Sequence, residues 1–255
     1  MMGKNAVSVV ENTAPEPVDS GTLALVRPKL AATNRRPVPS FLLPAVENAF
    51  SFRYAVLKRA LDIVLSLLSL IALWPFGLVI ALLIKITSPG PVFYCEERLG
   101  RFRVPFRIIK FRSMYISKPK SKILDISQVQ RRTQQANRFQ KRVRDPRITP
   151  LGRILRRMSL DELPQLWNVL RGEMSLVGPR PVVNAERHLY GQYLPCYDLF
   201  LPGITGLWQV SGRSDLNYNL RVLLDRQYAS NWSCGLDLII LARTIPAVVS
   251  MRGAY

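Results

Sequence analysis

The sequence has few of the residues that metal clusters and disulfide-bonded proteins depend on. Among 255 residues there are only three cysteines and one histidine. Cys95, Cys196 and Cys234 share no CxxC spacing, which favours reduced thiols in a reducing compartment over a metal cluster. His188 has no partner histidine, so we interpret it as an ordinary surface residue.

Acidic residues are also scarce. The 36 Lys and Arg residues face 17 Asp and Glu residues, which gives a formal net charge of +19. Such an excess of positive charge predicts a polyanionic partner. Nucleic acid, anionic lipid headgroups and phosphorylated substrates all meet that description, so composition alone leaves these three classes open.

The first fifty residues lack both an early apolar run and apolar periodicity. We therefore expect no cleavable signal peptide. Residues 1–50 are rich in Pro, Ala, Val, Asn and Thr, and we predict a disordered cytosolic tail there.

Residues 63–84 contain no charged side chain and are long enough to cross a bilayer as a helix. Their length and hydrophobicity disfavour the alternative of a buried core helix. Pro75 lies near the middle, where proline removes a helix hydrogen bond and clashes with the preceding turn. Basic residues flank both ends, and such flanks tend to stay cytoplasmic. We predict that residues 51–87 form a re-entrant membrane helix broken at Pro75; a kinked spanning helix is the alternative.

We assign residues 88–255 to one catalytic domain of α/β class, with a small sheet and surrounding helices. The patterns of 88–100 and 104–114 predict strands. The polar, basic stretch 115–146 predicts a long loop with a helical piece. The last part of the chain predicts two helical segments that meet near Gly235, the second an amphipathic helix docked on the core or the membrane interface.

The most informative segment is RRMSLDELPQLWNVLRGEMSLVGPRP, which begins at Arg156. Pro164 belongs in the first turn of a helix, where its missing N–H is not needed. This places the helix start near Asp161 and its end at Gly172.

The adjacent carboxylates at this helix start have two interpretations. One is capping, with Asp161 as N-cap or Ser159 and Glu162 as a capping box. The other is catalysis, with Asp161 as an ionised nucleophile beside a helix end that attracts phosphate. Glu162 would then hold a divalent ion, which offsets the repulsion between carboxylate and phosphate.

The arginines around this pair favour the catalytic interpretation. A solvated basic face is the usual explanation of a basic run. Arg180, however, lies in VGPRPV, where two prolines stiffen the backbone and suit bidentate phosphate binding. Together with Arg156 and Arg157, it would stabilise charge that develops on an oxygen at phosphorus.

On these motifs the sequence resembles the monotopic phosphoglycosyl transferases of the bacterial sugar transferase family. Its nearest branch resembles the polyprenyl-phosphate hexose-1-phosphate transferases, such as the galactosyl-phosphate enzyme that initiates exopolysaccharide synthesis. The resemblance covers residues 55–255. It rests on KRALD (58–62), SPGPVFY (88–94), KFRSM (110–114), DPRITPLGRILRRMSLDELPQLWNVLRGEMSLVGPRP (145–181), PGITGLWQVSGRS (202–214) and the terminal GAY.

The resemblance implies roles for individual residues. Asp161 and Glu162 match the family's covalent dyad, in which the aspartate is the nucleophile and the glutamate a ligand of Mg²⁺. Arg156 and Arg180 match phosphate-binding arginines. Lys110 matches a lysine near the site.

Two further positions are less clear. Arg112, next but one to that lysine, is a weaker candidate for phosphate binding. Asp237 matches a family aspartate for which an ion pair with an arginine and a catalytic role stay open. Pro75 matches the break in the family's re-entrant helix.

The resemblance implies transfer of hexose-1-phosphate from a UDP-hexose, with galactose or glucose as the sugar, to undecaprenyl phosphate with release of UMP. The expected location is the cytoplasmic face of the bacterial inner membrane. A homo-oligomer stays open, and no nucleic acid is expected as a partner.

Two other functions compete with this one. A membrane-tethered nucleic-acid-binding protein fits the charge but not the carboxylate pair. A non-catalytic membrane scaffold for polysaccharide machinery is the second alternative.

Overall fold

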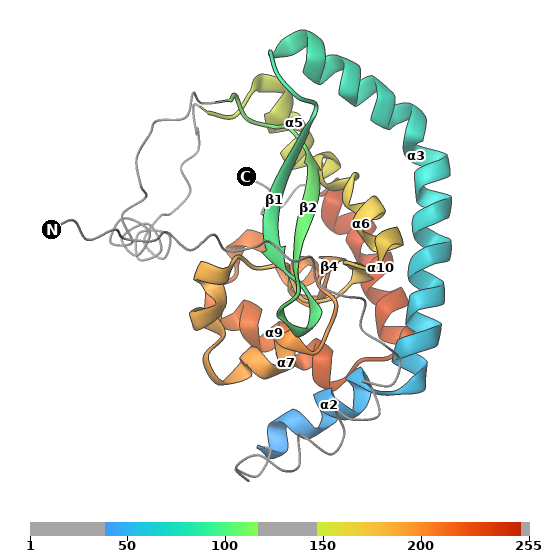
Figure 1. Cartoon of the computed structure of the whole chain (residues 1–255), viewed down its shortest axis with the longest axis vertical. Coiled ribbons are helices and arrows are strands. Elements are labelled where there is room, and N and C mark those ends of the chain that lie inside the picture. Colours follow the sequence, from blue (N-terminus) through green and yellow to red (C-terminus); the bar gives the residue numbers. More distant parts are fainter. Residues whose placement is uncertain (1–38, 117–146, 251–255) are drawn as a thin grey trace, which may run out of the picture. The chain divides into compact units, whose positions relative to one another are not determined.

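The computed structural model describes residues 39–116 and 147–250 (Figure 1). Residues 1–38 of the predicted tail and most of the predicted 115–146 loop lie outside the described residues. The α-helices are α2 (Leu43–Ala49), α3 (Arg59–Thr87), α5 (Pro150–Arg157), α6 (Gln165–Arg171), α7 (Leu194–Asp198), α8 (Leu207–Ser211), α9 (Tyr218–Ser230) and α10 (Cys234–Val249). The strands are β1 (Phe93–Leu99), β2 (Pro105–Phe111), β3 (Ser175–Val177) and β4 (Gly203–Thr205). Shorter helical turns are η1 (Ser40–Leu42), η2 (Arg53–Lys58), η3 (Arg101–Arg103), η4 (Leu160–Glu162), η5 (Asn184–Tyr193) and η6 (Arg213–Asp215).

Strands β1 and β2 form an antiparallel pair, which confirms the two predicted strands. The register sets Cys95 opposite Ile109 and Tyr94 opposite Lys110. Along β2, Phe106 and Ile108 are buried, and Lys110 follows at the same two-residue spacing. Lys110 therefore lies on the same face of β2 as these core residues, and it contacts Glu162, the residue next to Asp161.

Strands β3 and β4 form a second pair, which is parallel and was not predicted. Two glycines, Gly178 after β3 and Gly203 in β4, allow these two chain segments to approach closely. A Cβ built on Gly203 would lie 2.1 Å from the backbone N of Gly178, and one on Gly178 would lie 2.4 Å from Leu201 O. The loop that carries Arg180 is thereby packed directly against the glycine-rich segment around β4.

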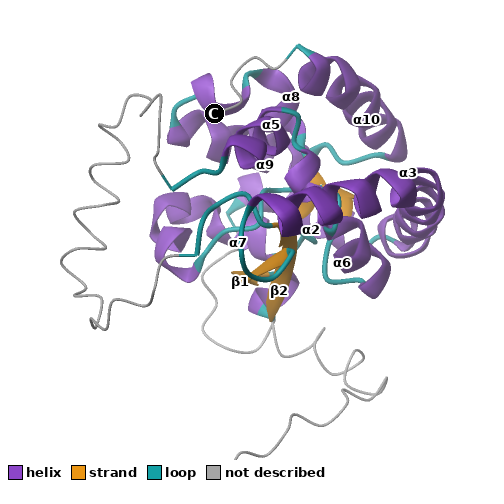
Figure 2. Cartoon of the chain, turned by 90° about the horizontal axis from the view of Figure 1, so that it is seen from above, coloured by secondary structure: helices purple, strands orange, loops and turns teal. Residues whose placement is uncertain are grey.

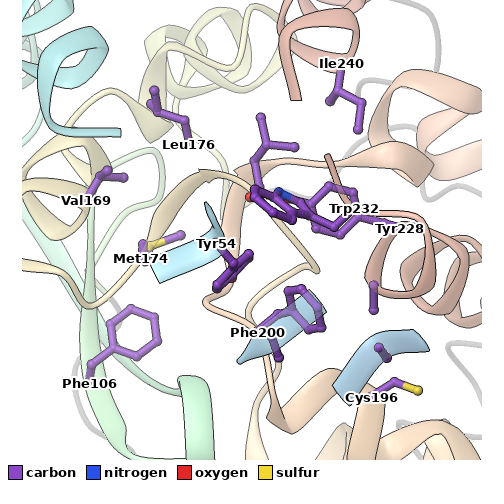
Figure 3. Close-up of a cluster of buried hydrophobic side chains, with 14 of the residues drawn as sticks. Tyr54, Phe106, Val169, Met174, Leu176, Cys196, Phe200, Tyr228, Trp232 and Ile240 are labelled. Carbon is purple, nitrogen blue, oxygen red and sulfur yellow. The ribbon is translucent and has the colours of Figure 1, made fainter. Parts of the chain in front are cut away.

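The main hydrophobic core gathers residues from many helices and from β2 and β3 (Figure 3). Tyr54 of η2 is one of its centres, with its ring 5.0 Å from that of Phe200 and 4.9 Å from that of Trp232 in edge-on contacts. The segment just before α3 is therefore part of the folded domain.

The packed chain begins earlier than the sequence predicted. Ala45 and Ala49 of α2 are fully buried, and Asn48 Nδ2 donates to the carbonyls of Ala229 and Ser230. The assignment of residues 40–50 to a disordered tail was therefore wrong. A two-turn helix with small buried residues gives too short a periodic pattern to be recognised in the sequence.

Helix α3 is continuous, so the predicted break at Pro75 is not seen. Pro75 lies inside the helix, which Figure 1 shows as curved and which does not turn back on itself. A proline deletes only one hydrogen bond of the ladder, and the long apolar helix accommodates that loss by bending. The stretch Arg53–Thr87 is long and apolar enough to cross a membrane, and only 11% of its most hydrophobic window is buried.

Both ends of α3 are docked on the same domain. At the start, Arg59 donates to the carbonyls of Val169 and Leu170 at the end of α6. At the other end, Ile80 and Ile84 pack in a cluster with Phe111 and Leu155. Figures 1 and 2 show α3 alongside α6.

A buried ion pair explains the position of Asp237. Lys58 Nζ lies 2.8 Å from Asp237 Oδ2, and both side chains are almost fully buried. Tyr228 and Trp232 donate to the same carboxylate. Asp237 therefore joins the end of η2, directly before the long apolar helix α3, to α10. Its cationic partner is a lysine where the sequence had suggested an arginine.

Candidate active site

The carboxylate pair lies in a tight turn between α5 and α6. Ser159 adopts the left-handed conformation at φ 55°, which reverses the chain after α5. Asp161 and Glu162 then lie in η4, and α6 begins only at Gln165. Neither η4 nor α6 has a side-chain cap hydrogen bond, so the capping interpretation of the pair is not seen.

Asp161 is buried but not sealed, with 8% of its surface exposed. Burial, and secondarily the negative charge of Glu162, raise the pKa of Asp161 above its usual value. The positive charges of Lys110 and Arg156 oppose this rise. The carboxylate of Asp161 is therefore more basic than that of an exposed aspartate, while the two neighbouring cations favour its ionised form.

The pKa of Glu162 is shifted in the opposite direction, below its usual value. Lys110 Nζ lies 2.8 Å from Glu162 Oε1, and 29% of the glutamate side chain is exposed. Burial alone would raise the pKa of Glu162, but the charge and hydrogen bond of Lys110, the charge of Arg180 and the amide of Gln165 together lower it. The two adjacent carboxyl groups therefore differ in acidity, which separates their chemical roles.

A small pocket, partly open to solvent, lies beside this pair. Three predicted site residues line it together: Lys110, Glu162 and Arg180. Arg180 is exposed, and its guanidinium lies 5.8 Å from the ring centre of Trp208. With Arg98, the pocket has three cations and one carboxylate at its wall, next to the buried Asp161.

The other arginines named from the sequence, Arg112, Arg156 and Arg157, do not line this pocket. Arg156 Nε donates to Ser113 Oγ at 2.7 Å, and its charge still reaches Asp161. Arg112 is only 5% exposed and donates to the carbonyls of Ser88 and Pro89. This carbonyl environment fixes the turn after α3 and argues against the predicted phosphate contact of Arg112.

Sequence reasoning missed several polar residues at the site. Arg98 and Gln209 line the pocket. Arg213 donates to Ser159 Oγ at 3.3 Å, and its charge interacts with that of Glu162. Its left-handed backbone, at φ 52°, directly follows Gly212. The glycine-rich motif PGITGLWQVSGRS was the available signal, because loops of this kind bring polar side chains to a site.

The donor set suits a magnesium ion better than a metal held by protein ligands alone. The described residues contain no cluster of three or more His, Cys, Asp and Glu side chains. Mg²⁺ is usually held by one or two carboxylates, with waters and substrate phosphates completing its shell. Asp161 and Glu162 supply that number of carboxylates, so the site fits the predicted metal.

Fold and site together define a transferase-like pocket for phosphorylated substrates, mounted on a long apolar helix. Comparison with known proteins is consistent with this class. Residues 53–251 match the family model described as "Bacterial sugar transferase". The chain therefore belongs to the bacterial sugar transferase family, as its motifs had suggested.

Three similar proteins indicate the range of this family. The exopolysaccharide production protein ExoY of Sinorhizobium fredii is 39% identical over 226 residues, which are 89% of this chain and 100% of that protein. The undecaprenyl-phosphate galactose phosphotransferase of Salmonella typhimurium is 45% identical over 84% of this chain and 45% of its own length. The UDP-glucose:undecaprenyl-phosphate glucose-1-phosphate transferase of Caulobacter vibrioides is 39% identical over 78% of this chain and 72% of its own.

Proposed function

We propose that this protein transfers hexose-1-phosphate from UDP-galactose or UDP-glucose to undecaprenyl phosphate, with release of UMP, as the first step of surface-polysaccharide synthesis. The observation that carries the proposal is the meeting of Lys110, Glu162 and Arg180 in one pocket beside Asp161. The named activities of similar transferases from Salmonella and Caulobacter support the same reaction.

In the first proposed step, an ionised oxygen of Asp161 attacks the sugar-bearing phosphorus of the UDP-hexose. The bond from that phosphorus to the bridging oxygen breaks, and the bridging oxygen leaves with the electron pair as part of UMP. In the second step, a phosphate oxygen of undecaprenyl phosphate attacks the same phosphorus. The phosphorus–Asp161 bond breaks, which restores the carboxylate and forms the lipid diphosphate.

The residues around Asp161 would serve these steps electrostatically. The raised pKa of Asp161, caused mainly by burial, makes its carboxylate a stronger nucleophile than an exposed aspartate. Arg180 and Lys110 in the pocket would bind the diphosphate and stabilise the charge on its oxygens as the bond breaks.

Mg²⁺ would be held by Glu162, with Asp161 beside it. When bound, the ion neutralises phosphate charge and makes the leaving oxygen a better leaving group. The low pKa of Glu162, which Lys110 and Arg180 maintain against burial, keeps the metal-binding carboxylate ionised at neutral pH.

We further propose that α3 enters the cytoplasmic leaflet of the bacterial inner membrane and does not cross to the far side. Its exposed residues are largely apolar, among them Leu68, Ile71 and Phe76. Both of its ends contact the same folded domain, which a helix with ends on opposite membrane faces could not do. This arrangement would hold the dyad near the lipid phosphate.

The experiment is a UMP-release assay with wild-type protein and Asp161→Asn across a panel of UDP-sugars, with and without chelation of magnesium. We expect release with UDP-galactose or UDP-glucose, and loss of release in Asp161→Asn and on chelation. Asp198→Asn is a matched control, because Asp198 is a buried carboxylate paired with Arg103 and Arg187 away from the pocket. Wild-type turnover in Asp161→Asn would refute the nucleophile. Failure of every UDP-sugar would favour the non-catalytic scaffold.

A further inference from the structure

The pocket wall continues beyond Lys110 along the β1–β2 hairpin. In the antiparallel register, Glu96 of β1 pairs with Ile108 of β2. Two residues further along β1, Arg98 pairs with Phe106. Paired residues project from the same face of a sheet, so Glu96 and Arg98 lie on the face that carries Lys110. Phe106 lies four residues before Lys110, which is about 13 Å along the strand. One end of this wall is therefore at the carboxylate pair and the other at Arg98.

Arg98 has hydrogen-bonding capacity that the protein does not use. Its Nη2 forms an ion pair with Glu96 Oε2, and the Arg98 side chain is 14% exposed. Its Nε is buried and has no hydrogen-bond partner among the described residues. Arg98 itself lines the pocket. A guanidinium with unused donors at a pocket wall is suited to bind the oxygens of a ligand.

Gln209 of α8, the helix that follows β4, lines the same pocket. Its Oε1 is buried and has no hydrogen-bond partner among the described residues. Gly206 leaves room for this oxygen, because a Cβ built there would lie 2.7 Å from it. A side-chain amide has a donor group and an acceptor oxygen, which exchange places when the amide turns over. Gln209 can therefore offer the pocket either kind of hydrogen bond.

These groups fit an uncharged, hydroxylated ligand better than a phosphate or a nucleobase. The charge of Arg98 is balanced by that of Glu96, so this part of the wall is neutral overall. A hydroxyl group both donates and accepts, which matches a guanidinium and an amide. A nucleobase is usually stacked on an aromatic ring, and none of the described residues that line the pocket is aromatic. A hexose satisfies all three conditions.

We propose that Arg98, held by Glu96, and Gln209 bind the hydroxyl groups of the hexose in the nucleotide sugar. This inference rests on the proposed function and adds the part of the site that recognises the sugar. The hexose is bonded to the phosphate that Asp161 would attack, so it must lie next to the carboxylate pair. The wall that runs from Lys110 to Arg98 begins at that place.

The test measures equilibrium dissociation constants for UDP-galactose, UDP-glucose and UDP at pH 8 with magnesium present. All proteins carry Asp161→Asn, so that no sugar phosphate is transferred. For each protein, the affinity for a UDP-hexose divided by the affinity for UDP gives the contribution of the sugar. This ratio is compared between the background alone and the background with Arg98→Lys, Gln209→Met or Arg107→Lys.

Each variant removes one hydrogen-bonding feature and keeps the size or charge of the side chain. Arg98→Lys keeps the positive charge that pairs with Glu96 but loses the planar fork of donors. Gln209→Met keeps an unbranched side chain of similar length without the amide. Arg107→Lys is the matched control, because Arg107 is exposed and lies on the opposite face of the same hairpin.

We expect the contribution of the sugar to fall about tenfold in Arg98→Lys and in Gln209→Met, as for the loss of one or two hydrogen bonds. The affinity for UDP should stay unchanged in both variants. Arg107→Lys should change neither quantity. Thermal unfolding checks the fold, and Gln209→Met should not lower the Tm, because the Gln209 oxygen has no partner to lose.

An equal loss of affinity for UDP and for the UDP-hexoses would overturn the inference, because the residues would then act on the nucleotide or on the fold as a whole. An unchanged ratio in either variant would overturn the role of that residue. Both results leave the proposed reaction standing, since UMP release is measured separately. Binding of none of the three ligands to the background would overturn the proposed function and the inference together.

Discussion

Lys110 Nζ lies 2.8 Å from Glu162 Oε1 and thereby connects strand β2 to the turn that carries the carboxylate pair. The same lysine lowers the pKa of both Asp161 and Glu162. One cation from a distant part of the sequence therefore favours the ionised form of two adjacent carboxyl groups within a partly buried site.

The first prediction concerns this lysine. Lys110→Met should raise the pKa of Asp161 and Glu162, so both carboxylates would become protonated at higher pH. The acidic limb of the rate of UMP release should shift to higher pH. The rate at pH 8 should fall about 100-fold, comparable to loss of one preorganised donor.

The measurement is the pH profile of UMP release. Lys85→Met is the control, since Lys85 is exposed and donates only to the carbonyl of Gly90 in the neighbouring turn. A Lys110→Met profile that coincides with wild type would contradict the assigned role.

The second prediction separates two arginines of the sequence motifs. Arg112→Gln should lower the Tm, because each charge-assisted hydrogen bond from its buried guanidinium contributes about 1.5–3 kcal/mol. Its KM for the UDP-sugar should stay near wild type. Arg180→Gln should do the reverse, with a raised KM and little change in Tm, because Arg180 is exposed in the pocket. Thermal unfolding and steady-state kinetics of both variants check this; a raised KM at unchanged Tm in Arg112→Gln would restore Arg112 as a phosphate ligand.

The third prediction concerns the anchor of α3. Lys58→Met should destabilise the protein by about 3–5 kcal/mol, because it leaves the charge of Asp237 buried and unpaired. Asp237→Asn in the same chain should recover part of that loss. A double-mutant cycle in detergent, followed by thermal unfolding, measures the coupling. Strictly additive effects would show that the pair does not stabilise the attachment of α3.

The fourth prediction concerns the topology of α3. Cys95 is exposed shortly after the helix, and Phe52, 76% exposed, precedes it. In spheroplasts, a membrane-impermeant maleimide should label neither the native Cys95 nor a cysteine introduced by Phe52→Cys. Both should react after the membrane is opened. Labelling of only one of the two sites from outside would establish a spanning helix and contradict the proposal that α3 does not cross the membrane.

The local elements could be predicted from the sequence because their signals are local. An aromatic-rich run after a Pro–Gly–Pro turn identified β1, and alternation of apolar and basic residues identified β2. Gly172, at φ 80°, ends α6 where the glycine rule placed it. The β3–β4 pair could not be predicted, because each strand has three residues and the pairing joins Ser175 to Gly203. Short strands of this kind are defined by their partners.

The site was predictable in its residue types and less so in its geometry. Asp161, Glu162, Lys110 and Arg180 were identified from motifs, but only the fold brings the last three to one pocket. The surroundings of Arg112 could not be predicted, because a basic motif does not reveal that its guanidinium donates to backbone carbonyls.

The most direct test of the account is to trap the sugar phosphate on Asp161. Wild-type protein incubated with UDP-sugar labelled with ³²P at the sugar-bearing phosphate, and without lipid acceptor, should retain label. Undecaprenyl phosphate should then remove it. Asp161→Asn should retain none, and Asp198→Asn should label as wild type does. Label on Asp161→Asn equal to wild type, or UMP release by wild type without any retained label, would contradict a covalent intermediate on this residue.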